Sequence, residues 1–261
     1  MDKILVTGGA GFIGSALVRL LARSALRSRL PLVVIDRLTY AGDLSRLKEC
    51  SLSVGTNFKF YKSDICSKKE IDNIFSKEKP DTVVHLAAET HVDRSILDAD
   101  PFIETNIRGT QLLMDAGRRH KIKRFIFIST DEVYGETPRG KFTEASRIKP
   151  NSPYAASKAA ADLLVQAYIR TYKFPAIIIR PCNNYGPWQF PEKLIPVAIA
   201  SILKGKKVPV YARGENVREW LYVDDCAAGV LRVLKFGKTG EIYNLGSGIE
   251  RKRSEERRVG K

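Results

Sequence analysis

The sequence is poor in cysteine. Only four cysteines occur in 261 residues, namely Cys50, Cys66, Cys182 and Cys226. Their separations match neither the ligand spacing of a zinc site nor the dense framework of a disulfide-stabilised domain. We therefore expect free, mostly buried thiols in a reducing compartment, and no metal site.

Long apolar runs are also missing. No segment approaches the roughly 20 apolar residues that a membrane-spanning helix requires. The N-terminus, Met1-Asp2-Lys3, leads straight into a short apolar run and lacks the features of a secretory signal. These patterns predict a cytoplasmic protein with no membrane partner.

Acidic residues are outnumbered by basic ones, 29 to 44, which gives a formal net charge of +15. Such a surplus is typical of proteins that bind nucleic acids, anionic membranes or anionic small molecules. The basic residues are scattered over expected helices and loops without a nucleic-acid-binding motif, and cluster densely only in residues 250–261. We therefore expect no nucleic-acid partner. An anionic small substrate remains as an explanation of the positive charge.

Short apolar runs alternate with longer helical patterns through residues 1–180. The expected strands are Ile4–Thr7, Leu32–Ile35, Phe58–Tyr61, Thr82–Leu86, Phe125–Ser129 and Ala176–Arg180. The expected helices are Gly14–Ser24, Ser67–Ser76, Pro101–Arg119 and Ala155–Tyr172. Near-continuous apolar strands that alternate with helices predict an α/β fold, a doubly wound parallel sheet of the Rossmann type with helices on both faces.

A smaller, interrupted C-terminal lobe is expected over residues 181–248, after this Rossmann domain of residues 1–180. Its expected elements are a helix at Ile195–Lys204 and strands at Val208–Tyr211, Glu219–Val223 and Glu241–Gly248. Residues 249–261 lack apolar periodicity and predict a disordered basic tail. The abrupt change at Ile249 leads us to expect a chain that is cut short at its C-terminus.

A glycine-rich turn joins the first strand to the first helix. Gly8, Gly11 and Gly14 allow the tight turn, the approach of a pyrophosphate and the packing of helix against strand that a dinucleotide site needs. A purely structural turn is the alternative, but Asp36 closes the second strand at the expected distance. Its carboxylate suits a ribose 2′-hydroxyl and favours NAD over NADP, although the neighbouring Arg37 keeps NADP open.

Tyr154 and Lys158 lie four residues apart, on one face of an expected helix. Tyrosine is a poor base at its ordinary pKa near 10, and a nearby ammonium lowers that pKa by favouring the phenolate. Alone, such a pair is better explained as an amphipathic surface. The dinucleotide turn, together with Thr130 at the tip of a preceding strand, favours a catalytic pair.

Asp131 and Glu132 follow Thr130 at the edge where open α/β sheets keep their active sites. Two like charges in a partly desolvated cleft do not both ionise at low cost, so one carboxyl stays protonated. The pair then offers an acid and a base, as an elimination of water requires. Capping of a helix N-terminus is the structural alternative.

With these motifs the sequence resembles the dTDP-glucose 4,6-dehydratases, which belong to the extended short-chain dehydrogenases/reductases. The resemblance extends from the first strand to about Gly248. It is carried by Thr7–Ser15, Asp36–Gly42, Leu86–Ser95, Ser129–Gly135, Tyr154–Lys158, Asn183–Pro187, Pro191–Pro196 and Val217–Trp220. Related sugar-nucleotide 4-epimerases and decarboxylases lack the Asp131-Glu132 pair in this form.

The resemblance implies a lyase with assigned catalytic roles. Tyr154, assisted by Lys158, would deprotonate the glucose 4-hydroxyl while hydride leaves C4 for NAD, and Thr130 would orient the sugar. Glu132 would then remove the C5 proton, and Asp131 would protonate the 6-hydroxyl as it departs as water. Return of hydride to C6 would give a 4-keto-6-deoxy sugar nucleotide.

The resemblance also implies two binding sites and a homodimer. The NAD site would comprise Gly8, Gly11, Phe12, Ile13, Gly14, Asp36, Arg37, Leu38, Thr39, Asp64, Ile65, Leu86, Ala87, Ala88, Thr105, Tyr154, Lys158 and Asn184. The site for the nucleoside-diphosphate sugar would comprise Thr90, Thr130, Asn183, Lys193, Leu194, Pro209, Val210, Tyr211 and Arg218. Lys193 and Arg218 suit the diphosphate on chemical grounds.

Two departures from the family pattern stand out. The family has a longer C-terminal lobe, and Ile249-Glu250 stands where it usually shows Asn-Glu. A 4-epimerase or decarboxylase and a non-catalytic dinucleotide-binding protein remain alternatives. The acidic pair argues against the first, and the intact Thr130, Tyr154 and Lys158 argue against the second. The choice between thymine and uracil nucleotides stays open.

Overall fold

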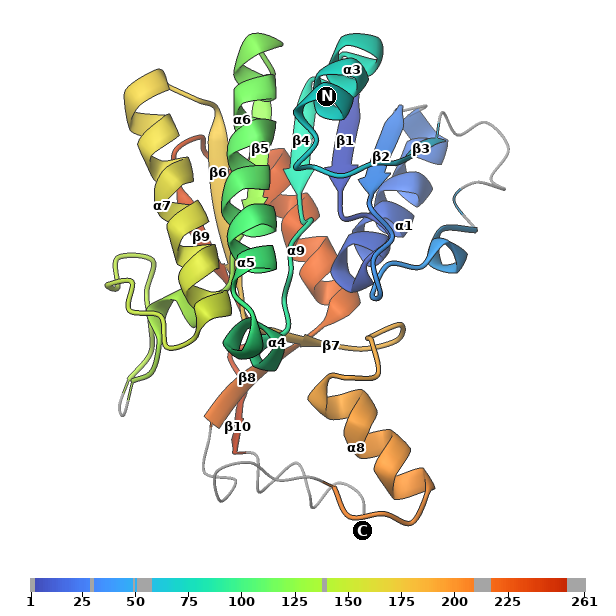
Figure 1. Cartoon of the computed structure of the whole chain (residues 1–261), viewed down its shortest axis with the longest axis vertical. Helices are drawn as coiled ribbons and strands as arrows, with labels where there is room; N and C mark the ends of the chain where they lie inside the picture. The colour runs from blue at the N-terminus through green and yellow to red at the C-terminus, as the bar shows by residue number, and fades with distance from the viewer. Residues whose placement is uncertain are drawn as a thin grey trace.

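The computed structural model describes residues 3–28, 31–48, 50, 58–137, 140–208 and 217–252. Within them, seven strands form one parallel sheet in the order β3-β2-β1-β4-β5-β6-β9 (Figure 1). The strands are β1 (Ile4–Thr7), β2 (Leu32–Asp36), β3 (Phe58–Lys62), β4 (Thr82–His85), β5 (Arg124–Ile128), β6 (Ala176–Pro181) and β9 (Ile242–Leu245). This confirms the expected doubly wound sheet, with its order reversing between β1 and β4.

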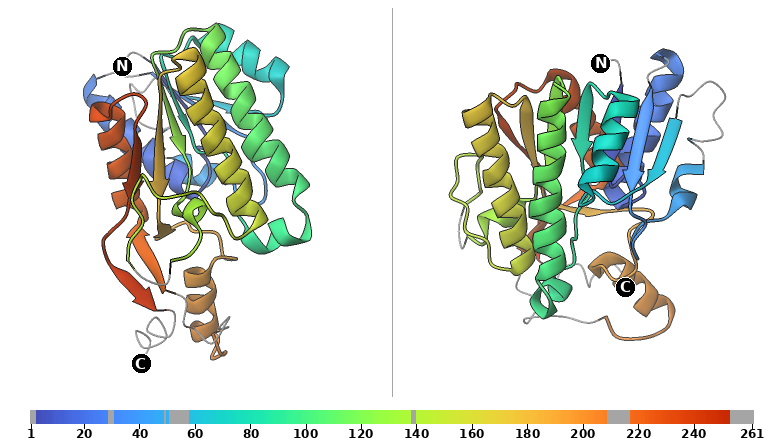
Figure 2. Two further views of the ribbon diagram at one scale, coloured as in Figure 1. Left: turned by 90° about the vertical axis from the view of Figure 1, so that its left-hand side faces the viewer. Right: turned by 45° about the horizontal axis from the view of Figure 1, so that its top comes forward.

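Helices cover both faces of the sheet, which buries the strands and explains their continuous apolar character. Ile4 and Val6 of β1 pack in the core beneath α1 (Phe12–Ser28) and α9 (Val223–Phe236). Leu5 points into the opposite core, beneath α3 (Lys68–Glu78), α6 (Thr110–Arg119) and α7 (Pro153–Tyr172). The two helical layers stand on opposite sides of the sheet in Figure 2.

The helix expected over Pro101–Arg119 is not a single α-helix. It divides into α5 (Asp100–Phe102), a π-helical segment η2 (Ile103–Gly109) and α6. In η2 the buried Asn106 accepts a hydrogen bond from the N–H of Glu89 and donates one to its carbonyl, at 2.9 and 3.0 Å. These bonds tie the wide turn to the loop after β4, and such π-turns often lie at functional sites.

A second, three-stranded sheet has the order β10-β8-β7 and lies below the carboxyl edge of the large sheet (Figure 1). Its strands are β7 (Asn183–Tyr185), β8 (Val217–Tyr222) and β10 (Glu250–Lys252). The helix expected at Ile195–Lys204 is α8 (Leu194–Leu203), which belongs to the same lobe. The short helix α4 (Val92–Leu97), which the sequence pattern did not indicate, lies nearby after β4.

Two segments lie elsewhere than the expected domain limits place them. Residues 223–245 fall within the predicted small lobe, yet α9 packs on α1 and β9 pairs with β6 in the large sheet. The cause is the apolar face of α9, where Cys226, Val230 and Leu234 recur at helical spacing and are buried. Residues 250–252 fall within the predicted tail but form β10, which pairs antiparallel with β8 through backbone bonds that need no apolar pattern.

None of the four cysteines, all of which lie in the described part of the chain, forms a disulfide, and Cys50, Cys182 and Cys226 are buried, as the sequence predicted. Among the described residues, no helix is both long and apolar enough to cross a membrane. The same residues contain no group of three or more His, Cys, Asp or Glu side chains suited to hold a metal ion.

Candidate active site

A cleft of about 1660 Å³ opens at the carboxyl edge of the large sheet, where the strand order reverses. Open α/β sheets place their ligands in this position. The cleft is lined by the glycine-rich turn, the loops after β2, β4 and β5, the start of α7, and β7 and β8 of the small lobe. Every described residue predicted for the cofactor, catalytic and sugar-nucleotide sites lines it, with the exception of Leu38.

Leu38 packs its side chain against the hydrophobic core instead of lining the cleft. Its backbone adopts φ 58°, because the N–H of Leu38 donates a 2.8 Å hydrogen bond to the carboxylate of Asp36 and closes a tight turn. Leu38 therefore contributes its main-chain N–H to this turn, and its side chain does not face the cleft. The predicted substrate residues Pro209, Val210 and Tyr211 lie outside the described residues.

The glycine-rich turn is too crowded for side chains. Gly8 has φ +70°, and a Cβ there would lie 2.6 Å from the backbone nitrogen of Ala87. A Cβ on Gly14 would overlap the carbonyl oxygen of Gly8. Helix α1 then begins at Phe12 with no acidic residue in its first turn, which leaves the positive end of the helix dipole available to an anion.

Asp36 closes β2 beside this turn. Its carboxylate also accepts a 2.9 Å hydrogen bond from the N–H of Ala10. Burial raises the pKa of Asp36, while the N–H groups of Leu38 and Ala10 oppose that rise. The carboxylate is thus fixed in place beside the glycine-rich turn, where doubly wound folds of this type bind a ribose hydroxyl.

Arg46 is a residue that the sequence analysis missed. It lies in η1 (Leu44–Leu47), and its Nη1 donates to the main-chain oxygens of Ala10 and Ala41, at 2.9 and 2.8 Å. The side chain is buried, and its charge acts to lower the pKa of Asp36. A lone basic residue in a loop carries no sequence signal for this role.

Tyr154 enters the cleft from the first turn of α7. Ser152 caps this helix by accepting from the N–H of Ala155 at 3.1 Å, and Ser95 of α4 accepts from the N–H of Tyr154 at 3.0 Å. Burial raises the pKa of Tyr154, the charge of Glu132 raises it further, and a hydrogen bond with Thr130 opposes the rise. The lowered pKa expected from the sequence is therefore not found.

Lys158 lies one turn further along α7, fully buried, and its Nζ donates a 2.6 Å hydrogen bond to the main-chain oxygen of Ile128. Burial lowers the pKa of Lys158 to about 7, and the negative charge of Asp162 opposes this shift. Near neutral pH the side chain of Lys158 is thus present in both its charged ammonium form and its neutral amine form.

His85 lies in a buried hydrogen-bonded chain behind this lysine. Thr110 donates to the carbonyl of Asn106 at 2.6 Å, so it accepts from Nε2 of His85 at 2.9 Å. Nδ1 of His85 then accepts from the hydroxyl of Thr7, 2.7 Å away. Burial lowers the pKa of His85 to about 3, and the charge of Lys158 adds to the effect, so the ring is a neutral spacer.

Thr130, Asp131 and Glu132 lie at the end of β5 and open the short 3-10 helix η3 (Asp131–Tyr134). Thr130 caps it by accepting from the N–H of Glu132, and its hydroxyl donates to Asp131, both at 3.3 Å. Burial and then the charge of Glu132 raise the pKa of Asp131 to about 7. Burial also raises the pKa of Glu132, against the charges of Arg218 and Lys193. The sequence predicted such a pair in which one carboxyl stays protonated.

The small lobe supplies the opposite wall of the cleft. Lys193 precedes α8 and donates to the main-chain oxygen of Thr90 at 2.9 Å, while burial lowers the pKa of its ammonium. Arg218 of β8 is exposed at the cleft. Asn183 and Asn184 lie on β7, where Asn184 donates to the carbonyl of Cys182 at 2.8 Å. These groups suit a ligand with a diphosphate and several hydroxyls.

A contact across the cleft mouth also went unpredicted. The guanidinium of Arg94 lies 3.8 Å from the ring centroid of Tyr40, and its Nη2 lies 3.1 Å from a carboxylate oxygen of Glu192. The ring of Phe190 meets that of Tyr40 edge-on at 5.3 Å between centroids. These four side chains connect the loop after β2 to the small lobe.

The fold, the glycine-rich turn and the position of the cleft place this chain in the class of Rossmann-type dinucleotide-binding proteins. The model of the NAD dependent epimerase/dehydratase family matches residues 4–246. The chain therefore belongs to the NAD dependent epimerase/dehydratase family.

Known proteins of this family resemble the chain closely. A dTDP-glucose 4,6-dehydratase of Streptomyces niveus is 47% identical over 250 residues, which cover 95% of this chain and 73% of the relative. The crystal structure of DesIV, a dTDP-glucose 4,6-dehydratase from Streptomyces venezuelae with NAD and TYD bound, has a TM-score of 0.93 and 44% identity, covering 99% of this chain and 80% of that one. A UDP-glucose 4-epimerase of Thermotoga maritima with UDP-glucose has a TM-score of 0.88 and 30% identity, covering 99% and 81%.

Proposed function

We propose that this chain is an NAD-dependent dTDP-glucose 4,6-dehydratase, a lyase that removes one water from a nucleoside-diphosphate glucose. The observation that carries the proposal is the buried Asp131-Glu132 pair, which lines the same cleft as Tyr154 and Lys158. An oxidation at C4 needs the tyrosine and lysine, and an elimination across C5 and C6 needs an acid and a base besides. The greater identity to the dehydratases than to the epimerase, 44% against 30% among the structures, supports the same choice.

The residues around the glycine-rich turn fit NAD. The turn excludes side chains at Gly8 and Gly14, so the backbone and the start of α1 are open to a pyrophosphate. The fixed carboxylate of Asp36 suits the ribose hydroxyls. Bound in this position, NAD would supply the redox chemistry of the reaction, namely acceptance of hydride from C4 of the sugar and its return to C6.

Tyr154 takes the proton of the sugar 4-hydroxyl in the first step. Because burial raises the pKa of its phenol, the phenolate needs a positive charge close by. In this proposal the ammonium of Lys158, one turn further along α7, supplies that charge. Thr130 is placed to orient the sugar, since its hydroxyl lies between the tyrosine and the acidic pair. Lys158 is held for this role by the carbonyl of Ile128.

Glu132 and Asp131 carry the elimination. The ketone at C4 acidifies the C5–H bond, and Glu132 takes that proton because the charges of Arg218 and Lys193 favour its ionised form. Asp131, whose pKa is raised to about 7, is still partly protonated at neutral pH, and its protonated form gives the proton to the departing 6-hydroxyl. In the reactive form the two neighbouring carboxyls thus have opposite protonation states.

The small lobe binds the nucleotide in this proposal. Lys193 and Arg218 bind the diphosphate, Thr90, Asn183 and Leu194 contact the substrate, and the Rossmann domain holds NAD. We extend the proposal to a homodimer, because the large apolar side chains of Leu97, Ile103 and Leu163 are exposed on α4, η2 and α7. We also propose that the protein is cytoplasmic. Sedimentation of the purified chain tests the oligomeric state.

Mass spectrometry of the reaction products tests the function. The chain is incubated with NAD and either dTDP-glucose or UDP-glucose, and we expect loss of one water from dTDP-glucose. The Asp131→Asn variant is expected to form no dehydrated product, whereas Glu136→Gln, which removes an exposed carboxylate of the same cleft, retains activity. Conversion of the sugar nucleotide to its C4 epimer without loss of mass would identify an epimerase and overturn the proposal.

A further inference from the structure

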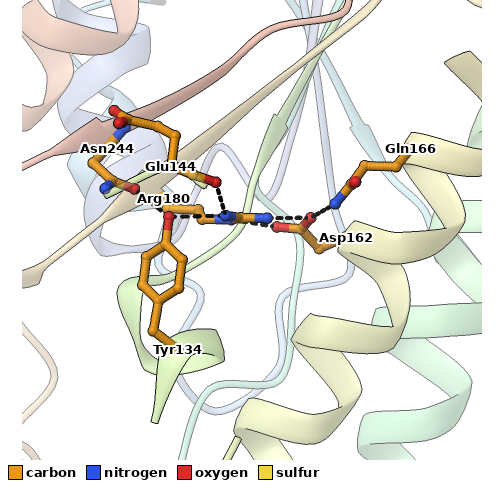
Figure 3. Close-up of polar contacts among 6 residues, drawn as sticks. All are labelled: Tyr134, Glu144, Asp162, Gln166, Arg180 and Asn244. Carbon is orange, nitrogen blue, oxygen red and sulfur yellow. Dashed lines mark hydrogen bonds and ion pairs between the residues drawn. The ribbon is translucent and has the colours of Figure 1, made fainter. Parts of the chain in front are cut away.

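A buried arginine connects the two halves of the proposed catalytic machinery. Arg180 lies on β6, only 2% exposed, and its Nε and Nη2 donate to the two carboxylate oxygens of Asp162 at 2.9 and 2.8 Å (Figure 3). Asp162 is completely buried on α7, one turn beyond Lys158, and Gln166 also donates to it at 2.8 Å. The fork of Arg180 is therefore fixed to the helix that carries the tyrosine and the lysine.

The remaining nitrogen of Arg180 points the other way, toward η3. Its Nη1 donates to the hydroxyl of Tyr134 at 2.8 Å, and that hydroxyl donates to Oδ1 of Asn244 on β9 at 2.7 Å (Figure 3). Nη1 also lies 3.5 Å from the main-chain oxygen of Glu144. Four of the five N–H donors of the guanidinium are thus used by protein groups.

Tyr134 is the last residue of the single turn that presents Asp131 and Glu132. A 3-10 turn of four residues has little stability of its own, so its position depends on tethers. One tether is the hydrogen bond from the N–H of Lys149 to the carbonyl of Val133 at 2.9 Å. Val133 and Tyr134 also pack against Ala159 of α7. The hydroxyl of Tyr134 adds a polar tether, which leads through Arg180 to Asp162 on α7.

A buried ion pair contributes little net stability, because desolvation offsets the attraction of the charges. Its usual benefit is geometric, since a planar guanidinium fixes the direction of each group that it binds. Here the groups are Asp162, one turn from Lys158, and Tyr134, two residues from Glu132. The Arg180–Asp162 ion pair is therefore placed to set the distance between Glu132, the proposed base for C5, and the Tyr154–Lys158 pair.

We propose that Arg180, fixed by Asp162, is a positioning residue. Through the hydroxyl of Tyr134 it holds the Asp131-Glu132 turn in a fixed position relative to α7. Elimination then depends on this hydroxyl more than the preceding oxidation does, because Tyr154 and Lys158 are held by their own long helix. The inference rests on the proposed dehydratase function for its kinetic consequence, but the tether itself is a property of the protein alone.

The Tyr134→Phe variant tests the tether because it removes one hydroxyl and keeps the ring, which stacks on Phe142 at 5.0 Å between centroids. Hydrogen exchange is measured on the purified chain without substrate. We expect faster exchange of the amides of residues 130–135 and unchanged exchange in residues 154–166. Tyr168→Phe is the matched control. It also removes one tyrosine hydroxyl, but this one lies on α7 and donates to Asp115 of α6 at 2.9 Å. Unchanged exchange in residues 130–135 would overturn the tether.

Single-turnover absorbance of NADH with dTDP-glucose then separates the two steps. Its appearance reports C4 oxidation, and its disappearance reports elimination followed by return of hydride. In Tyr134→Phe we expect appearance within about twofold of the unaltered chain and disappearance about tenfold slower, so that NADH accumulates. Equal slowing of both steps would overturn the assignment of a positioning role, whereas a loss of folded protein would lower only the amplitude of the NADH signal.

Arg180→Lys provides an independent variant, because an ammonium cannot bind both oxygens of Asp162 and the hydroxyl of Tyr134 in the same geometry. We expect NAD binding to persist and NADH to accumulate as in Tyr134→Phe. If the unaltered chain forms no NADH from dTDP-glucose, the proposed function fails, and the exchange measurement alone decides the tether. If it turns over and both variants retain its ratio of the two rates, the inference fails while the function stands.

Discussion

Lys158 and Ile128 connect the two catalytic elements of the cleft by one hydrogen bond, 2.6 Å from the lysine Nζ to the main-chain oxygen. Ile128 is the last residue of β5, two positions before Thr130. The ammonium is therefore held against the end of the strand that leads to the acidic pair. In the proposed mechanism its charge assists Tyr154, so its protonation state matters to the first step.

The rate of dehydration should fall as pH rises through about 7. Burial lowers the pKa of Lys158 to about 7, so the charged ammonium is lost above that pH. Burial raises the pKa of Asp131 to about 7, so its proton is lost over the same range. The pH dependence of kcat/KM for dTDP-glucose is the measurement, since it reports groups of the free enzyme. A rate that stays constant or rises between neutral and alkaline pH would contradict both assignments.

Asp131→Asn should stabilise the chain at alkaline pH while abolishing dehydration. The pKa of Asp131 is raised in the folded state, so its charge costs free energy of folding as pH rises from the ordinary value of 3.8 through about 7. An amide avoids that cost, and we expect a gain of roughly 1 to 3 kcal/mol in the free energy of unfolding above pH 7. Thermal melts at acid and alkaline pH measure it. An equal shift in Tm at both would show that the charge is not the cause.

Glu132→Gln should block elimination and leave C4 oxidation intact. The amide cannot accept the C5 proton, whereas Tyr154 and Lys158 are untouched. Single-turnover absorbance is expected to show NADH that forms and does not decay. Glu136→Gln, in an exposed position of the same cleft, is the control and should behave as the unaltered chain does. Dehydration by Glu132→Gln at the full rate would assign the base to another residue.

The sequence predicted the large sheet and the cleft because both depend on local patterns. Each parallel strand is an apolar run, and the glycine turn, the acidic pair and the Tyr154–Lys158 pair are short motifs at fixed offsets. It did not predict the contact of Tyr134 with Arg180, which are 46 residues apart in the chain. Such a contact is set by the packing of whole elements, for which local periodicity carries no information.

The edges of the fold were also harder to predict than its centre. The strand β9 was expected within Glu241–Gly248, but it is half-buried throughout and lacks the strong apolar signal of β1 or β4, so its pairing with β6 in the large sheet was not predicted. The π-helical segment around Asn106 keeps a helical pattern on both sides, so the sequence periodicity did not distinguish it from an α-helix. Leu38 was predicted to line the cofactor site from the resemblance, but the tight turn at Asp36 directs its side chain into the core.

NAD should bind more tightly than NADP, and Asp36→Asn should narrow the difference. The carboxylate of Asp36 accepts from the N–H groups of Ala10 and Leu38, so it cannot move away from a 2′-phosphate. We expect the unaltered chain to prefer NAD by at least about tenfold in Kd, and the neutral amide to gain affinity for NADP. Titration calorimetry with each dinucleotide measures this. Equal or tighter binding of NADP to the unaltered chain would contradict the role of Asp36.

Arg46→Met should weaken NAD binding although Arg46 lies outside the lining of the cleft. Its guanidinium binds the main-chain oxygens of Ala10 and Ala41, and so joins the glycine turn to the loop after β2. Its charge also opposes the rise that burial causes in the pKa of Asp36. Methionine keeps the apolar volume but supplies neither the hydrogen bonds nor the charge.

Loss of both effects should raise the Kd for NAD about tenfold at neutral pH, which corresponds to about 1.4 kcal/mol. Arg19→Met is the matched control, since among the described residues Arg19 donates to the main-chain oxygen of Arg46, at 3.4 Å, and makes no bond to the glycine turn. Calorimetric titration of both variants at neutral pH decides the case. An Arg46→Met variant with the Kd of the Arg19→Met control would show that the buried guanidinium does not support the cofactor site.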